Sequence, residues 1–257
     1  KLFTLLLFAV LSSYCAMAWD NRGHSTVAYI AERHLTPRAK ANIESYIGGR
    51  SIVYYAAWMD FNRSTPPFDV TRDWHVDYWT DAHRTDENGN PQPPCSVSQI
   101  KRIVSEMGDF RTLSDSLVNV NIKFLVHLVG DMHCPTHCYQ HNTNYKWPCK
   151  FKGKEHKTFH GIYDKMPQWM WKKTSATEIA EQIDNCSKGE IKKIQRGTFH
   201  DWARDCGEKC AVITEWNPIG TEELNPNTIE LSRDLVNMQM RDGGYRLAYL
   251  LNKYFGK

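Results

Sequence analysis

Apolar residues recur at helical spacing along most of the chain. Between residues 114 and 130, Leu117, Val120 and Phe124 fall three or four positions apart, so they share one face of a helix. Alternation of apolar and polar residues, which is typical of strands, is nearly absent. We therefore expect an all-α protein. The same helical pattern predicts further helices over residues 27–35, 96–110, 175–183 and 228–255.

Signals at the segment ends support this assignment of helices. Thr36 is a good N-cap and Pro37 suits the first position of a helix, while Gly48 and Gly49 are typical of a helix end. No internal repeat or domain linker interrupts the chain, which predicts one all-α domain. Proline, asparagine, glycine and charged residues gather in segments that we expect to be loops: 62–68, 85–94 and 141–153.

The first residues have the features of a secretory signal peptide. Lys1 precedes an apolar run that ends at Leu11, and Ala16-Met17-Ala18 matches an Ala-x-Ala cleavage site. We therefore expect a signal peptide over 1–18 and a mature domain over 19–257. The protein would be exported, to the periplasm or the extracellular space.

We expect no stable membrane anchor. The N-terminal apolar run is too short to span a bilayer, and no later window reaches the about 20 apolar residues that a membrane helix needs. Lipidation of Cys15 is an alternative, but Tyr14 stands where a small residue is expected.

Charge and cysteine content narrow the function classes. A formal net charge of +3 is too small for a broadly basic surface that binds nucleic acid, so a polyanion would have to be attracted by metal ions. Of the 8 cysteines, all but Cys15 would lie in an oxidising compartment, where we expect disulfides with at least one thiol unpaired or paired between chains. Metal thiolates remain the alternative for Cys134 with Cys138, or Cys206 with Cys210.

The strongest chemical signal is a group of histidines and aspartates. His127 with Asp131, and His160 with Asp164, form two His-x-x-x-Asp pairs around His137. On a helix, residues four apart lie about 6 Å apart along the axis on the same face, so each pair can close on one metal ion. A single pair would more often be a solvated hydrogen-bonded pair. Two pairs flanking a third histidine predict a metal site that suits zinc.

Further candidate ligands lie upstream of these pairs. After signal cleavage, Trp19 would offer a free α-amino group and a carbonyl oxygen, and His24 follows five residues later. Asp60 and His75 stand on either side of a segment that contains proline. Taken alone, His75 would be interpreted as a core histidine bonded to the backbone.

The order of the whole set resembles a known family. Trp19, Gly23-His24, Trp58-x-Asp60-x-x-Arg63, His75, the segment from His127 to His137, and Phe159-His160-x-x-Tyr163-Asp164 together resemble the type I single-strand-specific zinc nucleases, which are relatives of zinc-dependent phospholipase C. The segment Gly244 to Asn252 is similar to the closing helix of that family. The resemblance spans nearly the whole mature chain and implies the helical fold of that superfamily.

The resemblance also implies a cluster of three zinc ions. Asp131 would bridge two of them. Asp60, His75, His127 and Asp131 would hold the first ion; His137, His160 and Asp164 the second; and the Trp19 amino nitrogen and carbonyl, His24 and Asp131 the third. Zinc bound in this way lowers the pKa of a water towards about 7 and so supplies a nucleophile near neutral pH.

The implied activity is hydrolysis of phosphodiester bonds in single-stranded DNA and RNA, and of the 3′-phosphates of nucleotides. Products would carry 5′-phosphates and 3′-hydroxyls, and the enzyme would act as a monomer. Asp131 and Arg63 would be catalytic, with Arg63 clamping a phosphate oxygen. His133 would orient a ligand or contact phosphate.

Several positions depart from the family pattern and leave base preference open. Asp77 lies one residue before the usual base-reading acid, and Tyr78 would either stack on a base or belong to the core. Cys134 stands where glutamine is usual, and Tyr163 where tryptophan is usual. Two alternatives remain: a zinc phospholipase C, although that family typically has glutamate at the position of Asp164, and an exported zinc-binding protein without catalytic activity.

Overall fold

The computed structural model describes residues 19–78, 94–139 and 145–257. The expected signal peptide over 1–18 lies outside these residues, as does most of the expected loop over 85–94. Helices dominate the described part of the chain, which confirms the all-α prediction. No helix among the described residues combines the length and the apolar character needed to cross a membrane.

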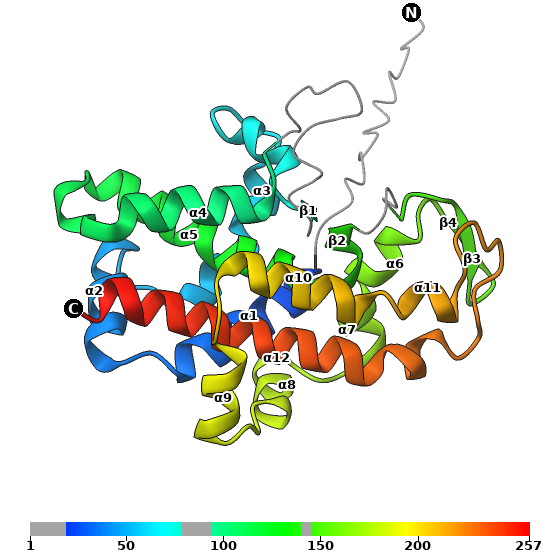
Figure 1. The fold of residues 1–257 in the computed structure, drawn as a ribbon. Helices are drawn as coiled ribbons and strands as arrows, with labels where there is room; N and C mark the ends of the chain where they lie inside the picture. Colours follow the sequence, from blue (N-terminus) through cyan, green and yellow to red (C-terminus); the bar gives the residue numbers. More distant parts are fainter. Residues whose placement is uncertain (1–18, 79–93, 140–144) are drawn as a thin grey trace, which may run out of the picture.

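Three helices form the centre of the fold. Helix α1 (Asn21–Arg33) packs against α12 (Thr228–Phe255) and against α5 (Asp115–Met132), and α5 also contacts α12. Figure 1 shows α12 running across most of the width of the molecule, with α1 behind it. The apolar faces of the three helices are buried in one continuous core, which holds the residues that carry the metal-binding side chains in place.

Short capping motifs set where the helices begin. The Ser114 hydroxyl accepts a hydrogen bond from Leu117 N–H and starts α5, and Thr36 does the same for Ala39 at the start of α2 (Pro37–Tyr46). Helix α8 (Ala176–Ile183) begins with a capping box between Ser175 and Glu178. These starts agree with the sequence interpretation.

The outer helices surround this centre. Helices α2 and α4 (Ser96–Glu106) cover one end, where α4 packs on α5. Helix α8 packs on α1, and α10 (Phe199–Cys210) contacts α4, α12 and the segment that follows α5. The remaining helices are short: η1 (Ile52–Tyr55), α3 (Trp58–Asn62), η2 (Phe68–Asp73), η4 (Met107–Thr112), η5 (Pro135–His137), α6 (His160–Asp164), α7 (Met166–Met170), α9 (Lys188–Ile194) and α11 (Ile213–Trp216).

Two small pairs of strands were not expected from the sequence. Strands β3 (Cys149–Phe151) and β4 (Lys154–His156) form an antiparallel hairpin, so the prediction of a loop throughout 141–153 is wrong for its last part. Strands β1 (Asp77–Tyr78) and β2 (Cys138–Tyr139) pair in parallel. Such short strands carry too little alternation to be seen in the sequence. The β1–β2 pair matters for the site, because it brings the chain after His75 alongside the chain after His137.

Candidate metal centre

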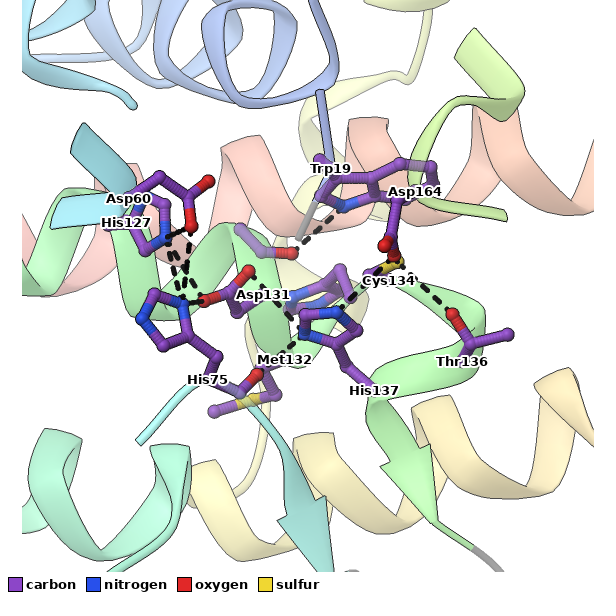
Figure 2. A network of polar contacts seen from close by, with 12 residues as sticks. Trp19, Asp60, His75, His127, Asp131, Met132, Cys134, Thr136, His137 and Asp164 are labelled. Atoms are coloured by element: carbon purple, nitrogen blue, oxygen red, sulfur yellow. Dashed lines mark hydrogen bonds and ion pairs between the residues drawn. The ribbon is translucent and has the colours of Figure 1, made fainter. Parts of the chain in front are cut away.

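The predicted ligands converge from six segments of the chain. They are all at most 8% exposed, although they are histidines and aspartates. Figure 2 shows the side chains of Asp60, His75, His127, His137 and Asp164 gathered around Asp131. Their sources are α1 for His24, α3 for Asp60, the segment before β1 for His75, α5 for His127 and Asp131, η5 for His137, and α6 for His160 and Asp164.

The first group surrounds one carboxylate of α5. His75 Nδ1 lies 2.9 Å and His127 Nε2 3.2 Å from Asp131 Oδ2. Asp60 Oδ1 lies 3.8 Å from His75 Nδ1 and 3.9 Å from His127 Nε2. The four side chains therefore present ligand atoms around a common point.

The second group joins η5 to α6. His160 Nε2 lies 3.0 Å from His137 Nε2 and 3.3 Å from Asp164 Oδ1. The distance from His137 Nε2 to Asp164 Oδ1 is 3.6 Å. His160 and Asp164 occupy the first and last positions of α6, so the predicted spacing of four residues does place them on one helical face.

His24 supplies a third group by sharing the carboxylate of Asp131. His24 Nε2 lies 3.5 Å from Asp131 Oδ1, the oxygen that does not face His75. The rings of His24 and His127 stack with centroids 4.0 Å apart. Asp131 thus has one oxygen toward each of two groups, which is the arrangement expected of a bridging ligand.

Backbone carbonyls orient two of the imidazoles. His127 Nδ1 donates to Ala56 O at 2.8 Å, and His137 Nδ1 donates to His75 O at 2.6 Å. Because the proton sits on Nδ1 in each case, the lone pair of Nε2 points into the cluster. Metal-binding histidines commonly use their second nitrogen in this way.

Several buried polar atoms of the cluster lack a hydrogen-bond partner among the described residues. They include both ring nitrogens of His24, both carboxylate oxygens of Asp60, and Asp164 Oδ2. Leaving such atoms unpaired is costly, and buried acidic groups are normally paired or bound to a metal. The donor set consists of imidazole and carboxylate, which suits zinc. The residues therefore fit a metal cluster.

The electrostatics of the cluster favour the metal-binding form of five of its groups. Burial lowers the pKa of His24, His75 and His137, and lowers that of His160 to about 4, so these rings are neutral at neutral pH. Burial would raise the pKa of Asp131, but the nearby rings of His127 and His75 hold it well below its usual range.

In contrast, the pKa values of two other groups of the cluster are raised. Burial, with help from the carboxylates of Asp60 and Asp131 and against the effect of His160, raises the pKa of Asp164 to about 8. Burial opposes protonation of His127, but Asp131 and Asp60 raise its pKa to about 9. Both groups must lose a proton to become ligands. Metal and proton therefore compete at these two positions.

Trp19 lies at the edge of the cluster and is completely buried. Its indole Nε1 donates to Gly130 O at 3.0 Å, and the next backbone N–H, of Asp20, donates to Asp164 O at 2.7 Å. A Cβ on Gly23 would lie 2.8 Å from the Cβ of Trp19, so only glycine lets the chain turn so closely around this side chain. The start of the expected mature domain is thus tied to both α5 and α6.

The expected phosphate-binding arginine also lies in the site. Arg63 follows α3 directly and is 6% exposed, and its Nη1 is 3.4 Å from Asp60 Oδ1. Arg63 is therefore a buried residue beside a candidate ligand and not a surface arginine.

The other predicted substrate contacts are not supported in the same way. His133 is buried against α12: its Nδ1 donates to Val129 O at 2.7 Å, and its Nε2 accepts from Arg246 Nη1 at 2.9 Å. Both nitrogens are engaged inside the protein, so this position does not support a contact with substrate. For Asp77 and Tyr78 the structure describes the backbone of β1, and their side chains lie outside the described atoms.

The sequence interpretation favoured a disulfide for Cys134 and kept a metal thiolate only as the alternative, yet in the structure its thiol lies beside the second group. The sulfur is 4.0 Å from Asp164 Oδ1, and burial together with Asp164 and Asp131 raises the pKa of this thiol well above its usual range. The position of Cys134 between the candidate ligands Asp131 and His137 is the feature of the sequence that could have indicated this. All seven cysteines of the described residues are free thiols, and disulfide pairing stays a prediction.

Comparison with known proteins identifies relatives along nearly the whole described chain. The profile of the S1/P1 Nuclease family matches residues 19–256. Nuclease P1 of Penicillium citrinum is 28% identical over 268 residues, which cover 93% of this chain and 98% of that protein. Endonuclease 4 of Arabidopsis thaliana is 25% identical over 288 residues, covering 93% of this chain and 90% of that protein.

Proposed function

The chain belongs to the S1/P1 nuclease family, and on this basis we propose that it is a zinc-dependent endonuclease that acts on single-stranded DNA and RNA. The observation that carries the proposal is the convergence of buried imidazoles and carboxylates, several of them without a hydrogen-bond partner among the described residues, around the shared carboxylate of Asp131. Such a group is costly in a protein that does not bind a metal.

The proposed ligand assignment follows the three groups. Asp60, His75, His127 and Asp131 hold the first zinc ion, and His137, His160 and Asp164 hold the second. The Trp19 amino nitrogen and carbonyl, His24 and Asp131 hold the third. When bound, zinc supplies a nucleophile from water near neutral pH and neutralises charge on the phosphate.

The residues of the chain orient the ligands and the substrate. Asp131 is the central positioning residue, because its two oxygens face different groups. Arg63 points its guanidinium into the same site and suits a non-bridging phosphate oxygen, for which a charge-assisted clamp is effective. The carbonyls of Ala56 and His75 keep His127 and His137 in the tautomer that offers Nε2 to the cluster.

We propose a substrate range that covers polymers and 3′-nucleotides. Cleavage leaves a 5′-phosphate and a 3′-hydroxyl, and the enzyme acts as a monomer. A bound metal cluster explains how a chain with a net charge of only +3 attracts polyanions. Base preference would depend on groups near Asp77 and Tyr78.

Export belongs to the same proposal. Removal of residues 1–18 would free the amino group of Trp19, and the protein would work in the periplasm or the extracellular space. The complete burial of Trp19 supports this assignment, because it places the first residue of the expected mature domain beside the proposed ligands.

One experiment tests the proposal directly. The purified protein is incubated with denatured DNA, duplex DNA, RNA, a 3′-nucleotide and a phosphatidylcholine emulsion, each with and without added zinc. We expect zinc-dependent hydrolysis of denatured DNA, RNA and the 3′-nucleotide, with little cleavage of duplex DNA. Hydrolysis of the lipid alone would identify a phospholipase instead, and zinc binding without turnover would identify a binding protein.

A further inference from the structure

Cys134 lies in a turn that is built between two proposed metal ligands. Its backbone N–H donates to Asp131 O at 2.9 Å, and its carbonyl accepts from His137 N–H at 2.9 Å. The residue is completely buried. These two hydrogen bonds fix the backbone of Cys134 relative to both proposed ligands.

The thiol points into the second group. The sulfur of Cys134, a ring nitrogen of His137 and a carboxylate oxygen of Asp164 all lie within 4.8 Å of one another. Figure 2 shows the sulfur next to the carboxylate of Asp164, between that carboxylate and Thr136. The sulfur lies 4.0 Å from Asp164 Oδ1 and 3.8 Å from Thr136 Oγ1, and both distances are too long for strong hydrogen bonds to oxygen.

The distance between Cys134 Sγ and Asp164 Oδ1 is close to the separation that two ligands of one zinc ion would have. With zinc–sulfur and zinc–oxygen bonds of about 2.3 and 2.1 Å, tetrahedral coordination separates the two ligand atoms by about 3.6 Å. The observed 4.0 Å between Cys134 Sγ and Asp164 Oδ1 is close to that separation. The separations among the other ligands are of the same size: 3.0 Å, 3.3 Å and 3.6 Å.

We propose that Cys134 is a fourth protein ligand of the second zinc ion, together with His137, His160 and Asp164. The inference rests on the proposed metal centre and adds to it a ligand that the family resemblance does not supply. A thiolate here brings a second negative charge to the site and fills a coordination position that water would otherwise hold. The second ion is then held more tightly and is less open to substrate than an ion with three protein ligands.

Substitution of the metal by cobalt tests the proposal without relying on activity. Cobalt(II) bound to a thiolate shows an intense sulfur-to-metal charge-transfer absorption in the near ultraviolet, which nitrogen and oxygen ligands do not produce. Metal-free protein is titrated with cobalt(II) for the unchanged chain, Cys134→Ser and Cys134→Gln. Zinc affinity is measured in parallel by competition with a chelating dye, and circular dichroism reports on folding.

Cys138→Ser is the matched control. Cys138 is also completely buried and lies only four residues away, but its sulfur contacts Met132 O at 3.1 Å and the thiols of Cys206 and Cys210. We expect the absorption in the unchanged chain and in Cys138→Ser, and its loss in both Cys134 variants. Zinc affinity at the weakest site of these variants should fall by about tenfold or more.

The outcomes separate this inference from the proposed function. Cobalt binding without the absorption in the unchanged chain, or an absorption kept by both Cys134 variants, overturns the thiolate ligand and leaves the metal centre intact. Failure of the unchanged chain to bind cobalt or zinc overturns the metal centre itself. Glutamine is included because it can fill the space without offering a thiolate, so a folded Cys134→Gln protein excludes an effect of misfolding.

Discussion

The Nδ1 atom of His24 lies 2.8 Å from the position that a Cβ on Gly130 would occupy. Helices α1 and α5 therefore approach each other closely where both carry proposed ligands. The approach lets His24 reach the oxygen of Asp131 that His75 leaves unused. The close approach of His24 thus gives a steric reason for a glycine directly before Asp131, the proposed bridging ligand.

Replacement of this glycine should displace one ligand. In Gly130→Ala the new methyl group would push the His24 ring away, and overpacking of this kind costs about 1–3 kcal/mol. We expect bound zinc to fall by about one ion per chain while the helical content is kept. Elemental analysis of dialysed protein measures this. Gly108→Ala is the control, since no atom lies within 4 Å of the position that its Cβ would take, and equal zinc contents in both variants would contradict the account.

Removal of the metal should abolish activity reversibly. Chelation should stop hydrolysis of denatured DNA, and zinc should restore it, because several buried polar atoms of the site have no hydrogen-bond partner among the described residues. Acidification should release zinc as well, since protons compete for the same ring nitrogens. Fewer than two tightly bound zinc ions per chain, measured by elemental analysis, would reject the cluster.

The bridging carboxylate should matter more for turnover than for binding. Asp131→Asn keeps the shape of the side chain but removes the charge shared by two groups, so we expect kcat to fall by about 100-fold or more with a smaller change in KM. Asp115→Asn, at the exposed start of the same helix, should behave like the unchanged enzyme. Near-normal turnover of Asp131→Asn at full zinc occupancy would exclude the bridging role.

An extra residue before Trp19 should weaken the third zinc ion. Extension converts the amino nitrogen into an amide, whose delocalised lone pair cannot bind a metal. We would compare protein that begins at Trp19 with protein that retains Ala18, after checking both N-termini by mass spectrometry. The extended form should hold less zinc and cleave denatured DNA more slowly with an unchanged circular dichroism spectrum. Equal zinc and equal rates would remove Trp19 from the ligand set.

Stability should depend on pH through Asp184, away from the metal centre. Burial alone would raise its pKa, but hydrogen bonds from His34, Tyr245 and Arg33, each 2.8 Å long, hold it below the usual value. A lowered pKa in the folded state gives stability that is present above the unfolded value of about 3.9 and is lost as pH falls through the folded value.

Asp184→Asn should therefore lower the free energy of unfolding by about 2 kcal/mol near pH 7, with the difference shrinking below about pH 4. Urea unfolding at several pH values, with chelator present throughout, measures this difference apart from zinc loss. Asp234→Asn, on the exposed face of α12, should change stability by no more than about 0.5 kcal/mol. A difference that persists at low pH would show that charge is not the cause.

The parts of the site that follow from local geometry were predictable. His127 with Asp131, and His160 with Asp164, lie on helices as their spacing indicated, because periodicity fixes direction within a helix. Periodicity does not fix the direction of residues in short connecting segments. His137 was expected in the site because it lies between the two pairs, whereas His75, which taken alone would be interpreted as a core histidine, was included only through the family resemblance.

His133 illustrates the same limit. Helix α5 ends at Met132, and His133 is its C-cap, so the helical spacing no longer sets where its ring points. The structure turns the ring toward Arg246 of α12, and Arg246 in turn binds Asp205 at 2.7 Å. Contacts between segments more than a hundred residues apart depend on tertiary packing, which a single sequence does not reveal.

The hydrogen bond from the Trp19 indole to Gly130 joins residues 111 positions apart, and from this separation we expect the metal centre to form late in folding. Long-range contacts form late in folding, because closing a long loop costs entropy that only other native contacts repay. The cluster should therefore assemble after α1, α5 and α12 have packed. Zinc would then enter a largely folded protein and stabilise it as the last step, with little influence on the folding rate.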